Sequence, residues 1–261
     1  MKRIHLFEFE DLPWFPNLFR GFITDLLEFQ LRNFEVYNPI YPKLQEIINK
    51  TNSNKIIDLC SGSAGPLLQI CNHLYTKDNR PIPIILTDKY PNKKMFERAK
   101  DQSNGQIDFI GKPVDATCVD SELFGLRTLF TSFHHFHPEI AKKIIGDAVD
   151  KGVPIGIFEF TERTPTNILK VLFFGILLVL INTPFIRPFK WKRIIWTYLI
   201  PIVPLAYSWD ALVSHLRTYS IKELSEIVTE LGDVDYLWEI SQIKSLKSGF
   251  NITYVIGYKK N

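Results

Sequence analysis

Short apolar runs alternate with amphipathic stretches through the middle of the chain. The runs between Lys55 and Phe160 are rich in Ile, Leu and Phe, and they are too short for helices. They lack the polar alternation of a half-exposed strand, which indicates strands buried on both faces of a parallel sheet. We expect strands at Ile56–Leu59, Pro83–Thr87, Ile107–Ile110, Thr128–Ser132 and Val153–Phe160, and helices at Pro66–Tyr75, Lys93–Lys100 and Pro138–Lys151.

The two ends of the chain follow different patterns. Near the C-terminus, Tyr236–Ile243 and Ile252–Tyr258 predict two strands. The tight turn predicted at residues 247–249 is too short for a crossover, so this pair must be antiparallel. Near the N-terminus, Asp25–Phe34 and Tyr41–Asn49 carry apolar residues at roughly helical spacing. We interpret this N-terminal part as a helical cap on the core, or as a lid over a substrate pocket.

The segment between Arg163 and Trp209 departs from both patterns. It holds six basic residues and no acidic one, and Val171–Ile181 and Ile194–Trp209 are uncharged apolar stretches. A membrane-spanning helix needs about 20 apolar residues, whereas Ile168–Ile186 is interrupted by polar residues and proline. We expect residues 168–209 to make peripheral contact with one leaflet, with the basic side chains at anionic lipid. A buried helical wall of an apolar pocket, a dimer interface and a true span are the alternatives.

Composition places the chain among globular proteins. Its 261 residues are 46% hydrophobic and 23% charged, which is enough apolar material for a sizeable core. A net charge of +3 is too small to indicate nucleic-acid binding, so we expect no such partner. Three cysteines without metal-ligand spacing favour a reducing, cytoplasmic compartment over a disulfide framework. Glu8, Glu10 and Asp11 stand where a secretion signal requires an apolar run.

A turn of small residues joins the first predicted strand to the first predicted helix. From Asp58 to Gly65 it reads Asp-Leu-Cys-Ser-Gly-Ser-Ala-Gly. Small residues let the backbone turn sharply and approach a ligand, and the free amides at the helix start favour an anionic group. Asp88 and Asp115 follow the second and third predicted strands, and ligands of such sheets bind at the carboxyl ends of the strands. Each acid alone could be a helix cap or a surface residue. Together, the three acids could hold an amino group, two ribose hydroxyls and an adenine amino group.

This series resembles the class I S-adenosylmethionine-dependent methyltransferases. The turn is similar to their first motif, an acid followed by glycine-rich spacing, although Cys60 and Ala64 stand where the family often has glycine. The resemblance implies an α/β fold: a Rossmann-like, mostly parallel sheet with an antiparallel C-terminal strand and helices on both faces. It also implies S-adenosyl-L-methionine as the cofactor. The expected cofactor-binding residues are Asp58, Cys60, Ser61, Gly62, Gly65, Asp88, Lys89, Asp115, Ala116 and Ser132.

Three histidines lie in the loop Ser132–Pro138, which in related methyltransferases borders the methyl donor and the acceptor. Methyl transfer requires alignment and exclusion of water, and a histidine is suited to take a proton near neutral pH. We name His134, His135 and Glu159 as candidate catalytic residues. The histidines could instead cap the next helix, and Glu159 could pair with Arg163. The loop has no partner acids, so no metal site is expected.

Downstream of the apolar segment, Ser220 and Glu223 predict a capping box at the start of a helix. Arg217 and Tyr219 either reach an acceptor carboxylate or carbonyl group, or tie the apolar segment to the core.

These patterns divide the chain into four parts. They are an N-terminal helical cap or lid (residues 1–50), a cofactor-binding core (51–162), an apolar, basic insertion that we expect to be helical (163–209) and the C-terminal part of the core (210–261). We expect a methyltransferase that acts on a small, lipophilic acceptor in the cytoplasm or at the cytoplasmic face of a membrane. One alternative is a nucleotide-dependent oxidoreductase, against which the missing G-x-G-x-x-G spacing counts. Another is a non-catalytic membrane-associated binding module. The oligomeric state does not follow from the sequence.

Overall fold

The computed structural model describes residues 1–76, 80–232, 235–245, 247 and 249–260. Within these residues, one seven-stranded sheet has the strand order β3-β2-β1-β4-β5-β7-β6. Strands β1 to β5 run parallel, and β7 is antiparallel to both β5 and β6. The predicted mostly parallel sheet with a reversed C-terminal strand is therefore confirmed. The strands are β1 (Ile56–Asp58), β2 (Ile84–Leu86), β3 (Ile107–Phe109), β4 (Leu126–Phe130), β5 (Ile155–Glu159), β6 (Tyr236–Lys244) and β7 (Asn251–Lys259).

The fourth strand begins and ends two residues earlier than the sequence predicts. Leu126 pairs with Ile56 of β1, so Ser132 lies in the loop beyond the strand. The prediction misses the first two residues of this strand because the charged Arg127 interrupts the apolar run. Its guanidinium is buried and lies 2.7 Å from a carboxylate oxygen of Asp147 on the covering helix, which compensates the charge.

Helices cover both faces of the sheet. On one face, α2, α3 and α4 share an apolar core with the strands, and on the other face α5 and α9 do so. The predicted helix Pro66–Tyr75 is shorter than expected: α3 continues as a 3₁₀ turn, η3, and Tyr75 pairs with Pro81 instead. These elements are α2 (Tyr41–Thr51), α3 (Leu67–Ile70), η3 (Cys71–His73), α4 (Lys93–Gln102), α5 (Pro138–Asp150) and α9 (Ile221–Thr229).

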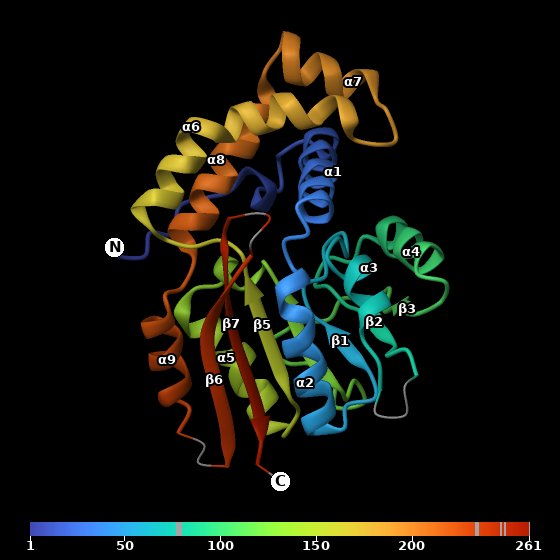
Figure 1. Ribbon diagram of the computed structural model, residues 1–261, viewed down its shortest axis with the longest axis vertical. Helices are drawn as coiled ribbons and strands as arrows, with labels where there is room; N and C mark the ends of the chain where they lie inside the picture. The colour runs from blue at the N-terminus through green and yellow to red at the C-terminus, as the bar shows by residue number, and fades with distance from the viewer. Residues whose placement is uncertain (77–79, 233–234, 246, 248, 261) are drawn as a thin grey trace.

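A separate helical layer stands at the carboxyl end of the sheet (Figure 1). Here α1 packs against α6 and α8 around its own apolar cluster, with Leu26 and Val179 fully buried. Helix α1 begins well before Asp25, because the apolar spacing continues back to Pro16, which precedes its first turn. The layer contains η1 (Phe9–Asp11), α1 (Asn17–Asn33), α6 (Pro165–Asn182), η5 (Thr183–Phe185), α7 (Trp191–Ile194), the π-helical turn η6 (Ile195–Leu199) and α8 (Ile202–Arg217).

Two short 3₁₀ turns complete the described elements: η2 (Asn38–Ile40) and η4 (Phe133–His135). The capping box at Ser220 and Glu223 is present at the start of α9, as predicted. The turn predicted at residues 247–249 includes Ser248, which lies outside the described residues.

One described helix, Pro165–Phe185, is long and apolar enough to cross a membrane, with a mean hydropathy of 2.2. The segments Trp191–Leu199 and Ile202–Arg217 meet the same criterion only as a pair, and this pair is bent by 77°.

Candidate functional site

The turn after β1 is held against the loop after β2. The Gly62 amide donates to Asp88 Oδ2 at 3.0 Å, and the Ser61 amide donates to the Thr87 carbonyl at 3.0 Å. The backbone is left-handed at Cys60 (φ 57°), Gly62 (φ 53°) and Ala64 (φ 60°). This conformation costs a residue with a Cβ roughly 1–2 kcal/mol, so Cys60 and Ala64 are under strain that a glycine would not have.

Asp58 ends β1 as a buried carboxyl group that is only 2% exposed. The Thr128 hydroxyl donates to its Oδ1 at 2.6 Å. Burial raises the pKa of Asp58 to about 7, more than its hydrogen bonds lower it. A cationic group next to this carboxyl would stabilise its ionised form.

The three predicted acids come together at this edge of the sheet. The Val114 amide donates to the Asp88 carbonyl at 2.9 Å, which brings the loop after β3 beside the loop after β2. Burial raises the pKa of the Cys60 thiol, and the charges of Asp88, Asp58 and Asp115 raise it further. The three carboxylates are therefore close enough to this residue to act on it electrostatically.

Asp115 is already paired in this structure. Its Oδ2 lies 2.8 Å from Lys89 Nζ, and the Thr117 amide and hydroxyl donate to its Oδ1. The pairing with Lys89 lowers the pKa of Asp115 to about 2. Ala116, next in the chain, is buried in the core.

Two predicted cofactor residues lie apart from the Asp88 contacts. A Cβ on Gly65 would meet Glu28 of α1, with the nearest atom at 3.6 Å, so Gly65 allows the helical layer to approach the turn. Ser132 is buried beyond β4, and its hydroxyl has no hydrogen-bond partner among the described residues.

Glu159 and His134 form a buried pair between the ends of β5 and β4. His134 Nδ1 lies 2.7 Å from Glu159 Oε2, and the Phe133 amide donates to Oε1 at 2.7 Å. Burial opposes ionisation of Glu159, but His134 and this amide outweigh it and lower the pKa of the carboxyl. Arg163 instead pairs with Glu223 at 2.5 Å, so the alternative pairing of Glu159 with Arg163 is wrong.

His135 lies in a cluster of charged groups. Its Nδ1 is 3.1 Å from Asp11 Oδ1, and its Nε2 is 3.7 Å from Glu8 Oε2. Burial lowers the pKa of His135, but the hydrogen bond to Asp11 and the charges of Glu8 and Asp11 raise it to about 9. Neither His134 nor His135 caps the next helix, because α5 begins after His137 and has no side-chain cap.

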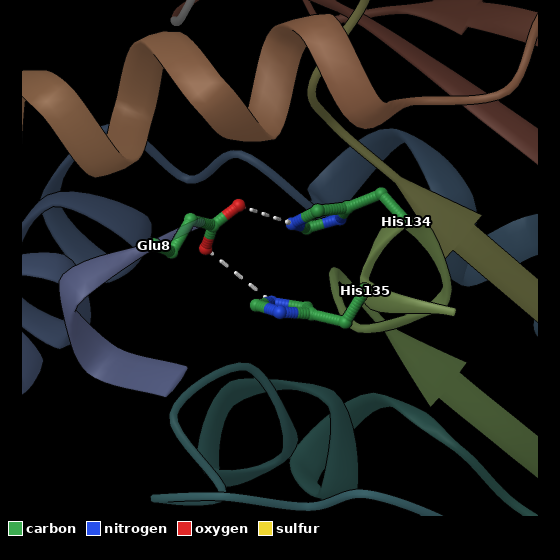
Figure 2. Close-up of side chains that lie close together, drawn as sticks. All are labelled: Glu8, His134 and His135. Atoms are coloured by element: carbon green, nitrogen blue, oxygen red, sulfur yellow. Dashed lines mark ion pairs between the residues drawn. The ribbon is translucent and has the colours of Figure 1, made fainter. Parts of the chain in front are cut away.

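Glu8 connects the two histidines (Figure 2). Its Oε1 is 3.9 Å from His134 Nε2, and ligand atoms of Glu8, His134 and His135 all lie within 4.8 Å of one another. The expectation of no metal site rested on the absence of acids from the histidine loop. That premise is wrong, because the fold supplies Glu8 and Asp11 from the N-terminal segment.

The N-terminal segment reaches this place by binding along α8. The Ile4 amide donates to the Leu216 carbonyl at 3.1 Å, and the Phe9 amide donates to Asp210 Oδ1 at 2.6 Å. Arg217 lies 2.7 Å from Asp11 Oδ2 and 3.2 Å from Glu8 Oε1. Arg217 thus ties α8 to the N-terminal segment, whereas the sequence analysis considered a tie between the apolar segment and the core.

Sequence reasoning missed Glu8 as a site residue. Glu8 was useful only as an argument against a secretion signal, because nothing in the local pattern of the chain links it to residues more than a hundred positions away. The one local signal was an acid between two aromatic residues, Phe7 and Phe9.

A cavity of about 470 Å³ adjoins the histidine pair beneath the helical layer. Its polar end includes Glu8, Glu10, His134, His135 and Asp210, and burial raises the pKa of Glu10 to about 8 and that of Asp210 to about 7. Apolar side chains of α1 and α6 make up much of the rest, among them Ile23, Leu27, Leu31, Val171, Phe174 and Leu178.

No protein-family model and no curated protein matches the sequence. Among solved structures, the chain is similar to the O-methyltransferase NcsB1 from neocarzinostatin biosynthesis, in complex with S-adenosylmethionine and 2-hydroxy-5-methyl naphthoic acid. The TM-score is 0.55 at 13% identity, over 96% of this chain and 60% of that chain. It is also similar to the methyltransferase domain of bacterial CtHen1-C, with a TM-score of 0.51 at 12% identity, over 87% of this chain and 100% of that chain.

Human N-acetylserotonin methyltransferase, in complex with S-adenosylmethionine, matches with a TM-score of 0.50 at 12% identity, over 94% of this chain and 58% of that chain. An O-methyltransferase family protein from Burkholderia thailandensis matches over only 57% of its own length. The chain thus spans less than two thirds of several of these enzymes. The similarity shows that the chain has the fold of class I S-adenosylmethionine-dependent methyltransferases.

Proposed function

We propose that this chain transfers the methyl group of S-adenosyl-L-methionine to a small, lipophilic acceptor bound in the cavity beneath α6 and α8. The observation that carries the proposal is the position of this cavity. Thr131, His134 and Thr161, which follow β4 and β5, contribute to its lining. Strand β4 pairs with β1, whose end carries the Asp58 turn. A methyl donor on that turn would therefore lie one strand away from the acceptor.

The turn after β1 fits the cofactor. A Cβ on Gly62 would meet no atom within 4 Å, so the space over the turn is open to a ligand. The bound cofactor supplies the methyl group. Asp58 would hold its amino group, Asp88 its ribose hydroxyls and Asp115 its adenine amino group, with Asp115 giving up part of its pairing with Lys89.

The cavity fits an acceptor with an apolar body and a polar reacting group. Side chains such as Leu27 and Phe174 would exclude water from the body of the acceptor. Glu159 holds His134 so that Nε2 faces Glu8 at the polar end. In that position His134 would orient the hydroxyl group of an acceptor or take its proton, with His135 beside it.

The outer face of the helical layer supports delivery of the acceptor from a membrane. Phe173 is 73% exposed, Trp191 73% and Leu199 77%. Figure 1 places α6 and α7 at the far end of the molecule from the C-terminus. Phe174 and Leu178 of α6 line the cavity, so the same helix separates it from this apolar face. A lipophilic acceptor could therefore pass from lipid to the site along α6.

Only some of the basic residues of the insertion are available to lipid. Arg193 is buried against Asp25 at 2.7 Å, and Arg163 pairs with Glu223. Arg187 and Lys192 are exposed, and neither is joined to an acid by an ion pair within the described part of the chain. These two cations beside the apolar face favour an anionic membrane surface at the cytoplasmic side.

Calorimetry with S-adenosylhomocysteine and, separately, NADH tests the cofactor assignment. We expect binding of the first and not of the second. Asp88→Asn should weaken S-adenosylhomocysteine binding by about 1.5–3 kcal/mol, because a hydrogen bond to a charged group is lost. Binding of NADH alone would favour the oxidoreductase alternative.

A transfer assay identifies the acceptor class. The chain is incubated with methyl-labelled S-adenosylmethionine and a total lipid extract, and then with a water-soluble extract. Label in lipid-soluble products supports the proposal, and label only in water-soluble products contradicts the lipophilic acceptor. Cofactor binding without any labelled product would favour a non-catalytic binding module.

A further inference from the structure

We propose that Glu8, His134 and His135 bind one divalent first-row transition-metal ion at the polar end of the cavity. Each residue offers one ligand atom, and the three atoms lie within 4.8 Å of one another. In Figure 2 the rings of both histidines point toward the Glu8 carboxylate, each from the same loop. Glu8 comes from the N-terminal segment, so only the folded chain assembles this group.

A buried nitrogen without a partner gives independent support. His134 is 1% exposed, and its Nε2 has no hydrogen-bond partner among the described residues. A buried polar atom left unpaired costs about 1–3 kcal/mol. Glu8 Oε1 lies 3.9 Å from this nitrogen, beyond hydrogen-bond distance. A cation between the two atoms would give His134 Nε2 the partner that it lacks.

The other nitrogen of each ring is held by a carboxylate. His134 Nδ1 lies 2.7 Å from Glu159, and His135 Nδ1 lies 3.1 Å from Asp11. In a neutral ring whose Nδ1 donates its proton to the carboxylate, the lone pair is on Nε2, which faces Glu8. The pKa of His135 is about 9, so an ion that binds this ring near neutral pH displaces the proton from its Nε2. Metal-binding histidines almost always have such a partner on the second nitrogen, which orients the ring and increases its basicity.

The distances and ligand types favour a small transition-metal ion. Bonds of about 2.0–2.2 Å in a tetrahedral site place neighbouring ligand atoms about 3.3 Å apart. His135 Nε2 lies 3.7 Å from Glu8 Oε2 and His134 Nε2 lies 3.9 Å from Glu8 Oε1. The three ligand atoms lie within 4.8 Å of one another, so the most distant pair must move together by up to about 1.5 Å when an ion binds. Two imidazoles with one carboxylate suit Zn²⁺ and its neighbours better than Mg²⁺ or Ca²⁺, which prefer oxygen ligands.

Arg217 offers the competing arrangement. Its Nη1 lies 3.2 Å from Glu8 Oε1 and 3.3 Å from His135 Nδ1, and it also pairs with Asp11. A carboxylate has about four lone-pair sites, so Glu8 can accept from Arg217 and still ligate an ion. In the competing arrangement Arg217 compensates the charge of Glu8, and the three proposed ligands bind no metal ion.

Three protein ligands leave a position open for a further ligand, as in catalytic zinc sites. All three residues line the cavity, so this position would face the acceptor. An ion there would bind the oxygen of an acceptor hydroxyl group and lower its pKa. His134 would then act on the acceptor through the ion rather than as a base. This role rests on the proposed function, whereas the binding of the ion does not.

Titration of the full chain with Co²⁺ and Zn²⁺, after removal of metal with a chelator, tests the site. We expect one equivalent of Co²⁺ to give visible absorption bands of nitrogen-ligated cobalt, and Zn²⁺ to abolish them by displacement. Glu8→Gln and His135→Gln should each weaken affinity by more than about 100-fold, since each removes a ligand. Glu10→Gln is the matched control, because Glu10 lines the same cavity but is not one of the three proposed ligands. The metal affinity of this variant should equal that of the wild type.

Asp11→Asn provides a second test if a variant of one of the three ligands fails to fold. Asp11 is partly exposed and contacts His135 only at Nδ1, and its loss should weaken metal affinity about 10- to 100-fold. Circular dichroism and S-adenosylhomocysteine binding report folding separately. The inference is overturned if the wild type binds no stoichiometric metal, or if Glu8→Gln and Asp11→Asn bind it as tightly as the wild type. Intact S-adenosylhomocysteine binding without metal binding would overturn this inference and leave the proposed function standing.

Discussion

Gly62 combines a backbone requirement with a position over the proposed cofactor site. Its φ of 53° lies in the left-handed region, and its amide donates to Asp88. Gly105, at the other end of the sheet, also has a positive φ, 81°, and open space around it. The two glycines therefore share the same conformational requirement but differ in what lies above them.

We predict that Gly62→Ala and Gly105→Ala both lower the free energy of unfolding by about 1 kcal/mol, because each forces a Cβ into this backbone region. Only Gly62→Ala should also weaken S-adenosylhomocysteine binding, since its methyl group would occupy the ligand's space. Urea unfolding and calorimetry measure the two effects. Equal cofactor affinity in both variants would place the ligand away from the turn.

Asp58 makes stability depend on pH. Its pKa is about 7 in the folded chain, whereas a carboxyl group ionises near pH 4 when unfolded. The folded state therefore holds the proton more tightly than the unfolded state. The stabilisation that results from this proton is fully present below about pH 4 and is lost as the pH rises to 7.

Asp58→Asn tests this dependence, because asparagine does not titrate and keeps an oxygen for the Thr128 hydroxyl. We predict that the free energy of unfolding of the wild type, relative to the variant, falls between pH 5 and pH 7.5. Urea unfolding of both proteins at both pH values measures the difference between their free energies of unfolding. The contributions of the other titrating groups are common to both proteins and cancel in this difference. A difference that does not change with pH would mean that Asp58 is ionised throughout.

Residue-level prediction succeeded where the signal is local. The turn from Asp58 to Gly65 and the acid after each of the next two strands are visible in the sequence, and the parallel sheet brings those strand ends together. Glu8 and Asp11 are different, because their positions depend on how the N-terminal segment binds along α8. No periodicity or motif near residue 8 encodes that contact.

At the level of elements, α6 and α8 have two apolar faces with different roles. Gly175 and Val179 of α6 are buried, and a Cβ on Gly175 would lie 3.0 Å from Ser208 of α8, so the two helices pack closely. The apolar pattern of the sequence predicted helices here but not which side chains are covered. That depends on the packing of α1 against them, which is a tertiary contact.

We predict that Phe173→Glu and Leu199→Glu each reduce binding to vesicles containing anionic phosphatidylserine by about tenfold. Each replaces an exposed apolar side chain by a charge that resists insertion and is repelled by the lipid. Leu237→Glu, on the exposed surface of β6, is the matched control and should bind as the wild type does. Vesicle co-sedimentation measures the binding. Equal loss in all three variants would indicate a charge effect unrelated to this face.

Over the whole molecule, the sheet is proposed to bind the cofactor and the helical layer to enclose the acceptor. The turn after β1 belongs to the sheet, while the cavity lies between the strand ends and α1, α6 and α8. The parallel strands were predictable because each is a local apolar run. The cavity was not, because its polar end combines residues from the N-terminal segment, the β4 loop and α8.

Ala211 of α8 lines the cavity and has a small side chain, which makes it a site where volume can be added. We predict that Ala211→Leu lowers the rate of methyl transfer at least tenfold, because its added carbon atoms occupy space that the acceptor needs. Binding of S-adenosylhomocysteine should stay within twofold of the wild type, since Ala211 lies in the helical layer and not at the turn. Ala211→Ser, which adds only one oxygen, should retain most of the activity.

The KM and kcat of Ala211→Leu show whether the substitution affects the binding of the acceptor or of the cofactor. If the leucine blocks the acceptor, the KM for the acceptor rises or turnover stops, while the KM for S-adenosylmethionine is unchanged. A parallel loss of cofactor binding in Ala211→Leu would instead mean that the helical layer and the turn respond as one unit. Full activity in that variant would place the acceptor outside the cavity. The proposal that the helical layer encloses the acceptor would then be wrong.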